Sequence, residues 1–316
     1  MSDLVLGIDG GGTKTVLALA DRAGHVVWQK RAPGIGPHEN PAWLPTLQAL
    51  MATASAYGDR VAYGAFAMPS FGEIDRVSAE QAAAAQQLGH FPHCVLNDVH
   101  AAFEGAFVGQ PGVLLLAGTG SMLWAEDGAG AQIRVGGWGQ GFGDEGSAFW
   151  IGRAAIAGLS QCLDGRAADP DFAAAMSRLL ALPAEGQAEA LLDWYCEVPD
   201  PRVKVASLAR EIDRMAETGN ATATTILTEA AAHLALHVRA AWQRLPTLPE
   251  GVWSAVGSIM NSRVVARHLV TLLDTPRVPA ALPPVGGALW RAATNAGWAA
   301  SPAWIDRLRT ELSLQS

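Results

Sequence analysis

The feature that most constrains this chain lies near its N-terminus, where a glycine turn separates two apolar segments in LVLGIDGGGTKTVLALA, residues 4–20. Residues 4–8 and 16–20 predict two buried β-strands. The glycines at 10–12 predict a tight turn between them, and no bulky side chain covers its backbone N–H groups. Such a turn can bind phosphate oxygens through backbone donors, and Thr13 adds a hydroxyl.

Asp9 stands directly after the first predicted strand. A carboxylate repels phosphate, so its position is explained if Mg²⁺ lies between the two, since Mg²⁺ is commonly held by one or two carboxylates, waters and substrate oxygens. The alternative is an ordinary glycine hairpin with an exposed Asp. A P-loop is excluded because Gly12-Thr13-Lys14-Thr15 lacks the Gly-Lys-Ser/Thr order and runs into a strand instead of a helix.

Length and composition limit the class of protein. The 316 residues suffice for two domains, and a chain that is 50% hydrophobic and 16% charged favours a well-buried globular fold. The net charge of −8 disfavours a general binder of nucleic acid or of an anionic membrane. An anionic ligand must therefore be captured locally, by backbone donors and a metal ion.

Targeting signals and cysteine usage favour the cytoplasm. No basic leader precedes the first strand, and no uncharged apolar run is long enough to cross a membrane. Cys94, Cys162 and Cys196 are isolated in the sequence, which predicts free thiols in a reducing compartment.

The strand–glycine–strand pattern occurs a second time, with strands at 113–117 and 122–126 around Gly118-Thr119-Gly120-Ser121. This repetition predicts a duplicated sheet domain. Further strands are predicted at 25–31, 61–68, 94–96 and 252–256, and helices at 44–51, 79–88, 101–107, 148–163, 172–182, 187–195, 204–217, 221–244, 261–273 and 286–299.

Two other stretches carry candidate chemistry. Asn97-Asp98 follows the strand at 94–96, at the strand end where α/β proteins place ligands. The loop 136–147 contains five glycines up to position 143. Ordering them costs conformational entropy, which favours a functional role for the loop. A third glycine turn, Gly257-Ser258, again follows an apolar strand, so the three turns suit a nucleotide with phosphates at the first two and adenosine near the third.

Five motifs follow one another along the chain: IDGGGTKT at 8–15, NDVHAA at 97–102, AGTGS at 117–121, GGWGQGFGDEGSAFWIGR at 136–153 and AVGSIMNS at 255–262. In these the chain resembles the N-acetylglucosamine kinase and BadF/BadG/BcrA/BcrD ATPase family of the actin–hexokinase–Hsp70 superfamily. The resemblance implies an α/β fold of two ribonuclease-H-like (actin-like ATPase) domains, each a mixed five-stranded sheet with flanking helices, and a cleft between them. We expect domains at 1–110 and 111–285, the second with a helical insertion, and a last helix at 286–300 packed on the first.

The activity implied by the resemblance is ATP- and Mg²⁺-dependent phosphorylation of N-acetylglucosamine at its 6-hydroxyl, in a cytoplasmic homodimer. Asp98 takes the position of the general base, which accepts the proton of the attacking hydroxyl. A helix N-cap is the structural alternative for Asp98. Glucosamine is the alternative acceptor. An activator-type ATPase would need paired cysteines for an iron–sulfur cluster, and a non-catalytic sugar sensor would not need Asp9, Asp98 and both phosphate turns.

The remaining site residues are also implied by the resemblance. Asp9 would bind Mg²⁺ through water. Phosphate binding is assigned to Gly10, Gly11, Gly12, Thr13, Lys14, Gly118, Thr119, Gly120 and Ser121. Adenosine binding is assigned to Gly219, Ala223, Gly257 and Ser258, although Asn220 stands where the family has Asp. Sugar binding is assigned to Asn40, Asp98, Gly137, Trp138, Gly139 and Asp144, with Trp138 alternatively a core aromatic.

Overall fold

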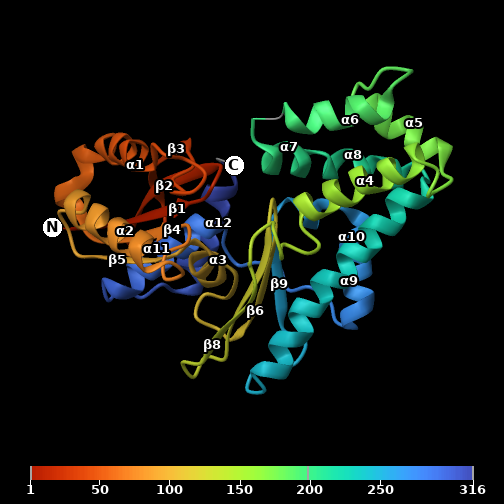
Figure 1. The fold of residues 1–316 in the computed structure, drawn as a ribbon. Coiled ribbons are helices and arrows are strands. Elements are labelled where there is room, and N and C mark those ends of the chain that lie inside the picture. Colours follow the sequence, from red (N-terminus) through yellow and green to blue (C-terminus); the bar gives the residue numbers. More distant parts are fainter. Residues whose placement is uncertain (1, 198, 315–316) are drawn as a thin grey trace. The chain divides into compact units, whose positions relative to one another are not determined.

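The computed structural model describes residues 2–197 and 199–314. The chain divides into two compact units (Figure 1), unit 1 up to Gln110 together with Pro279 onward, and unit 2 from Pro111 to Val278. The chain returns to unit 1 at Pro279, before the helix Pro284–Asn295, and not at 286. Two segments far apart in the sequence therefore build unit 1.

Unit 1 is a five-stranded mixed sheet with helices on both faces. Its strands are β1 Leu4–Gly10, β2 Lys14–Asp21, β3 Val26–Pro33, β4 Val61–Met68 and β5 His93–Asn97, in the order β3-β2-β1-β4-β5. The first three form an antiparallel meander, and β1, β4 and β5 run parallel. The helices of this unit are α1 Trp43–Ala52, η1 Ser55–Arg60, α2 Asp75–Leu88, α3 Asp98–Phe107, α11 Pro284–Asn295 and α12 Pro302–Leu314.

Successive side chains of a strand point to opposite faces of the unit 1 sheet, so they pack in two separate cores. Leu6 and Ile8 of β1 pack in the core under α1 and α2, and Val5 packs in the core under α11 and α12. Gly7 lies on the same face as Val5, where a Cβ would stand 2.8 Å from the backbone N of Leu289. Glycine thus lets α11 approach the central strand, on the face that also carries Asp9.

Unit 2 repeats the strand arrangement with a larger helical part. Its elements are β6 Gly112–Ala117, β7 Ser121–Glu126, β8 Gln132–Gly136, α4 Ala148–Leu163, α5 Pro170–Leu179, α6 Gln187–Cys196, α7 Pro201–Ser207, α8 Ala209–Glu217, α9 Ala221–Arg244, β9 Trp253–Val256, η2 Ser258–Asn261 and α10 Arg263–Leu273. The sheet order is β8-β7-β6-β9, with an antiparallel meander and β9 parallel to β6. The predicted duplication is confirmed, because β8-β7-β6-β9 matches β3-β2-β1-β4.

Three sequence-based expectations differ from the structure in unit 2. Its sheet has four strands among the described residues, not five. Strand β8 was not predicted, because its side chains are only partly buried and do not alternate clearly. The single helix expected at 204–217 is two helices that meet at Leu208, and the first begins earlier, at Pro201, with the Asp200 carboxylate accepting the Val203 N–H at 3.2 Å.

Candidate active site

The carboxyl ends of three parallel strands bring Asp9 and Asp98 to one edge of the unit 1 sheet. Asp9 of β1 is opposite Ala67 of β4, and Met68 of β4 is opposite Asn97 of β5. Asp98 follows directly as the first residue of α3. The register of the sheet therefore gathers the two aspartates that the sequence places 89 positions apart.

The N-cap of α3 is Asn97, not Asp98. The Asn97 Oδ1 accepts the Val99 N–H at 2.9 Å, and its Nδ2 donates to the Phe71 carbonyl at 2.9 Å. The Asp98 Oδ1 also accepts the Val99 N–H, at 3.0 Å. Because Asn97 supplies the cap, helix capping alone does not account for a carboxylate at position 98.

Burial and neighbouring charges change the proton affinity of both carboxyl groups. The pKa of Asp98 is raised to about 7, mainly by burial and in addition by the negative charges of Asp9 and Glu73. Burial also raises the pKa of Asp9 to about 6, while the positive charge of Lys14 opposes this. A carboxyl group with a pKa near 7 is well matched to accept a proton at neutral pH.

Asp9 fits a single-carboxylate Mg²⁺ site. Within residues 2–197 and 199–314, no three His, Cys, Asp or Glu side chains gather so that they could hold a metal ion by themselves. Mg²⁺ does not need such a cage, since it keeps several waters and binds one or two carboxylates plus phosphate oxygens. A carboxylate that is costly to ionise without a cation nearby, as Asp9 is, has the chemistry for that role.

The first glycine turn keeps two backbone donors available. The Gly11 N–H donates to the Lys14 carbonyl at 2.9 Å, and the Gly11 carbonyl accepts the Ile35 N–H at 3.0 Å. Among the described residues, the N–H groups of Gly12 and Thr13 have no hydrogen-bond acceptor. These two amides and the Thr13 hydroxyl are the groups of this turn that can bind an anion.

Asn40 lies in the loop that packs against this turn, but its side chain holds its own loop together. The Asn40 Nδ2 donates to the Gly34 carbonyl at 2.6 Å, and its Oδ1 accepts the Ala42 N–H at 2.9 Å. Gly34 is needed at this contact, because a Cβ there would lie 2.1 Å from the Gly12 carbonyl oxygen. Asn40 therefore supports the first turn, and a sugar would have to compete with these hydrogen bonds.

The second glycine turn, at Gly118–Ser121 in unit 2, is held by a buried carboxylate. The Gly118 N–H donates to the Gly120 carbonyl at 2.9 Å, while the Ser121 N–H donates to the Asp144 Oδ1 at 3.1 Å. The Ser121 hydroxyl donates to the Glu145 carbonyl at 2.8 Å. Of the donors expected to bind phosphate here, those of Ser121 are already engaged, whereas the amides of Thr119 and Gly120 donate to nothing in the part of the chain that the structure describes.

Asp144 is a structural support of this turn as well as a predicted sugar ligand. Its side chain is almost fully buried, its backbone has a φ of 58°, and its Oδ2 accepts a hydrogen bond from the Arg202 Nη2 at 3.2 Å. Sequence reasoning did not find Arg202, because the Pro199-Asp200-Pro201 stretch before it was interpreted as a connector. The structure brings Arg202 to a predicted site residue.

Trp138 is not a core residue. Its side chain is 66% exposed, and Phe142 in the same loop is 81% exposed. The Arg134 guanidinium lies over the indole at 5.5 Å, and it donates to the carbonyls of Gly136 and Gly137. With Gly137 and Gly139 at positive φ, this loop presents an aromatic ring and backbone groups on the surface of unit 2.

A cavity of about 430 Å³ in unit 2 has the size of a small-molecule site. It opens beside the second glycine turn, because Thr119 and Ser258 both line it. Gly257 allows this approach, since it has a φ of 110° and a Cβ there would lie 2.2 Å from the Ala117 carbonyl oxygen. The other lining residues come mainly from α7, α8 and η2: Ala148, Val203, Ala206, Ser207, Ala209, Arg210, Glu211, Asp213, Leu227, Ile259, Asn261 and Ser262.

Of the four residues predicted to bind adenosine, Ser258 lines this cavity, and Gly219 and Ala223 do not. Gly219 precedes α9, whose first turn is capped by the Asn220 side chain on the Ala223 N–H at 2.8 Å. The polar wall instead includes Asp213, whose Oδ1 accepts the Ser262 hydroxyl at 2.5 Å. The amphipathic pattern of residues 209–217 could have indicated a helix with one polar face, but not which cavity that face lines.

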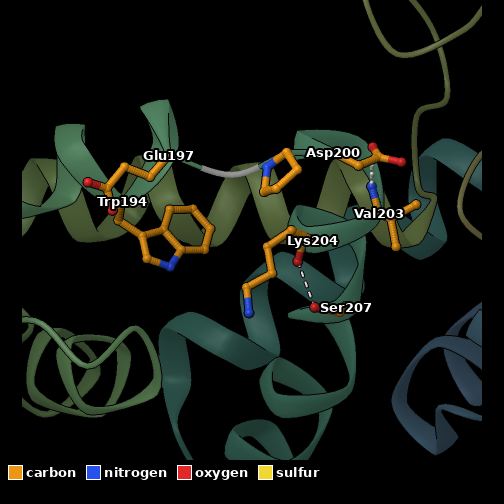
Figure 2. A pocket seen from close by; sticks show the side chains of 7 residues that line it. Trp194, Glu197, Asp200, Val203, Lys204 and Ser207 are labelled. Carbon is orange, nitrogen blue, oxygen red and sulfur yellow. Dashed lines mark hydrogen bonds between the residues drawn. The ribbon is translucent and has the colours of Figure 1, made fainter.

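A second cavity, of about 550 Å³, lies along α7 (Figure 2). Trp194, Glu197 and Lys204 form its walls, and the Ser207 hydroxyl donates to the Lys204 carbonyl at 2.6 Å. Val203 and Ser207 line both cavities. Helix α7 therefore contributes to both cavities, and no sequence motif indicated the second one.

Two similar sheets, each with a glycine turn after its first strand, and two aspartates at the strand ends of the unit 1 sheet, are the features of the actin-like ATPase class of folds. A family profile matches residues 6–282, and the chain belongs to the BadF/BadG/BcrA/BcrD ATPase family.

One curated relative is the N-acetylmuramic acid/N-acetylglucosamine kinase of Clostridium acetobutylicum, 29% identical over 169 residues, which are 53% of this chain and 54% of the relative. The chain thus matches about half the length of that protein. Two solved structures share the fold, both of candidate N-acetylglucosamine kinases. The Chromobacterium violaceum protein has a TM-score of 0.72 at 23% identity, covering 91% of this chain and 98% of that one. The Porphyromonas gingivalis protein has a TM-score of 0.71 at 18% identity, covering 93% and 99%.

Proposed function

We propose that this protein is an ATP-dependent amino-sugar kinase that phosphorylates the 6-hydroxyl of N-acetylglucosamine. The observation that carries the proposal is the half-buried Asp98 carboxyl group at the start of α3, which has a pKa of about 7 beside Asp9. A neutral hydroxyl is a poor nucleophile, so a positioned carboxylate that accepts its proton during attack is the group that such a reaction requires.

In the proposed reaction, the sugar oxygen forms a bond to the γ-phosphorus of ATP, the bond from that phosphorus to the ADP oxygen breaks, and the hydroxyl proton passes to Asp98. In unit 1 the amides of Gly12 and Thr13 can donate to phosphate oxygens, and in unit 2, taken by itself, the amides of Thr119 and Gly120 can do so. Bound Mg²⁺ would neutralise phosphate charge, with Asp9 holding it through water. The 430 Å³ cavity of unit 2 takes the nucleoside.

The choice of an amino sugar is supported by the curated relative, which is named for N-acetylmuramic acid and N-acetylglucosamine. It is also supported by the loop of unit 2 that presents Trp138, Gly137 and Gly139 at the surface. Aromatic rings and close backbone groups are suited to sugar faces and hydroxyls. Glucosamine is the alternative acceptor, because no residue of this loop by itself distinguishes an acetamide from an ammonium group.

The test is an assay of ADP release with a panel of acceptors: N-acetylglucosamine, glucosamine, N-acetylmuramic acid, glucose, and no sugar. We expect the highest kcat/KM with N-acetylglucosamine, and a phosphate on O6 in the product by NMR. The 6-deoxy analogue of N-acetylglucosamine is the matched control and should release no ADP above the level without sugar. Phosphorylation of glucose at least as efficient as that of both amino sugars would refute the substrate assignment.

We also propose a homodimer in a reducing cytoplasm. The three cysteines are unpaired, as expected there, and the part of the chain that the structure describes contains no helix suited by length and apolarity to span a bilayer. Light scattering of the purified protein tests the dimer, since a molar mass near that of one chain at micromolar concentration would contradict it.

A further inference from the structure

Arg202 is a charged residue beside the second glycine turn that the proposed chemistry has not yet used. Its Nη2 lies 3.2 Å from the Asp144 Oδ2 and 3.0 Å from the position that a Cβ on Gly120 would occupy. The side chain is 32% exposed, while that of Asp144 is 4% exposed. The guanidinium thus lies against the backbone of the turn, on a side chain that is partly exposed.

The turn needs a positive charge from elsewhere in the chain. Residues 118–121 contain no Lys or Arg, and the chain as a whole carries a net charge of −8. The Asp144 carboxylate, hydrogen-bonded to the Ser121 N–H, adds a buried negative charge next to the place proposed for phosphate. Without a cation, that charge would repel a polyphosphate across a low-dielectric environment. Arg202 neutralises it.

A guanidinium can serve both groups at the same time. It carries five N–H donors in a planar fork, so one edge can hold a carboxylate while another binds a phosphate oxygen. Asp144 fixes the orientation of this fork through a charge-assisted hydrogen bond. The backbone amides of Thr119 and Gly120 lie on the same turn as the contact with Arg202.

The position of Arg202 on α7 also agrees with the nucleoside cavity. Ala206, one helical turn after Arg202, lines the cavity, and so does Thr119, the neighbour of Gly120. A nucleotide with its nucleoside in the cavity and its phosphates directed toward Thr119 would therefore meet the guanidinium.

We propose that Arg202 binds the phosphates of the nucleotide at Gly118–Ser121 and stabilises the negative charge on the ADP oxygen as its bond to the transferred phosphoryl group breaks. Arg202 transfers no proton, and Asp144 is the positioning residue that holds it. This inference rests on the proposed kinase function and assigns a phosphate-binding role to a residue outside all five sequence motifs.

The test compares Arg202→Met, Arg202→Lys and the control Arg166→Met, which removes an exposed Arg–Asp pair elsewhere in unit 2. Affinities for ADP and adenosine are measured by calorimetry in the presence of Mg²⁺, and turnover by ADP release. For Arg202→Met we expect ADP affinity to fall about 10- to 100-fold, as for loss of a charge-assisted hydrogen bond, with adenosine affinity within about twofold of wild type. Turnover should fall with it, Arg202→Lys should recover part of both losses, and the control should match wild type.

Three results would overturn the inference. An equal loss of ADP and adenosine affinity would show that Arg202 only supports the fold of the cavity. Unchanged ADP affinity and turnover in Arg202→Met would show that the guanidinium does not bind phosphate. A wild-type protein that binds neither ATP nor ADP would reject the proposed function itself, and a thermal melt of each variant separates misfolding from lost binding.

Discussion

A general base at position 98 would have to meet two requirements. It must be close enough to other acids and to the protein interior for its pKa to approach neutrality, and it must still ionise to accept a proton. Burial, Asp9 and Glu73 meet the first requirement by raising its pKa to about 7. Asn97 supplies the N-cap of α3, and the Asp98 Oδ1 shares the Val99 N–H with it, so the second carboxylate oxygen of Asp98 is not needed for capping.

Replacement of Asp98 by Asn should remove the base with little change in shape. We expect kcat to fall about 10²- to 10⁴-fold at saturating ATP and N-acetylglucosamine, the range typical of general-base catalysis. Nucleotide affinity, measured by calorimetry, should stay near wild type, since the nucleoside cavity is in unit 2. Near wild-type turnover in this variant would show that another group accepts the proton.

The raised pKa of Asp98 also predicts a pH dependence of stability. Between the unfolded pKa of about 4 and the folded pKa of about 7, the folded state binds more protons, so the free energy of unfolding falls as pH rises through this window. Asp98→Asn removes the free-energy cost of ionising this carboxyl group in the folded protein. The variant should therefore be more stable than wild type above pH 7, and the difference should vanish near pH 4.

Chemical denaturation of both proteins from pH 4 to pH 8 measures this difference. The ligand-free protein must be used, because Mg²⁺ and nucleotide would stabilise the ionised carboxylates. A stability difference that is constant across the range would mean that the pKa of Asp98 in the folded protein is close to its ordinary value.

At the scale of elements, α3 carries Asp98 and is held by its contact with α11. The two helices approach closely at Gly105 and Gly287, where a Cβ on Gly287 would lie 2.0 Å from the Ala101 carbonyl oxygen. A buried ion pair between Glu104 and Arg291 also joins them. Since α11 packs in turn on β1 through Gly7, the strand that carries Asp9 and the helix that begins with Asp98 both pack against α11.

Gly287→Ala should disturb this support. The added methyl group meets backbone atoms, which cannot move aside as a flexible side chain can, so we expect a loss of about 1–3 kcal/mol in the free energy of unfolding. Gly58→Ala is the matched control, because no atom lies within 4 Å of its added Cβ, and it should change stability by about 0.5 kcal/mol or less. Urea denaturation measures both, and equal values for the two variants would contradict the close contact of α3 and α11.

At the scale of the whole molecule, the two units differ in whether one continuous segment of the chain forms them. Unit 2 is continuous from Pro111 to Val278, and its core is formed within that range. Unit 1 needs the last part of the chain, because Leu289, Trp304 and Leu308 of α11 and α12 are buried in the same core as Val5 of the first strand. The core of unit 1 can therefore be completed only with the segment that follows unit 2 in the sequence.

Truncation after Val278 should affect the units unequally. We expect the 1–278 fragment to lose the cooperative unfolding of unit 1, since removing α11 and α12 exposes one face of its sheet. A fragment of residues 111–278 should still fold, with a helical circular dichroism spectrum and a cooperative thermal transition. Limited proteolysis of the 1–278 fragment should degrade unit 1 first, whereas equal resistance of both units would contradict this assignment of the core.

The sequence by itself determined the elements that depend on local patterns. The apolar run, glycine turn and apolar run at 4–20 and again at 113–126 were sufficient to predict both hairpins and their duplication. The helices at 148–163 and 221–244 were predicted with the bounds that the structure has, because their periodicity is strong and a cap or a turn marks each end. Asp9 was proposed because its place after a buried strand is explained by a Mg²⁺ ion, whereas Asp98 was proposed because it lies in the motif NDVHAA of the family that the chain resembles.

Only the tertiary structure decided which polar groups remain available for a ligand and which support the fold. Ser121 and Asp144 lie in the motifs that indicated a site, and the resemblance assigned Asn40 to the sugar, yet the donors or acceptors of all three bond to groups of their own unit. Arg202 and Asp213 lie in a segment without a motif. Long-range packing brings Arg202 to the second glycine turn and Asp213 to the 430 Å³ cavity. The physical reason is that hydrogen bonds join groups close in space, and a linear pattern does not record distances between segments that meet only when the chain folds.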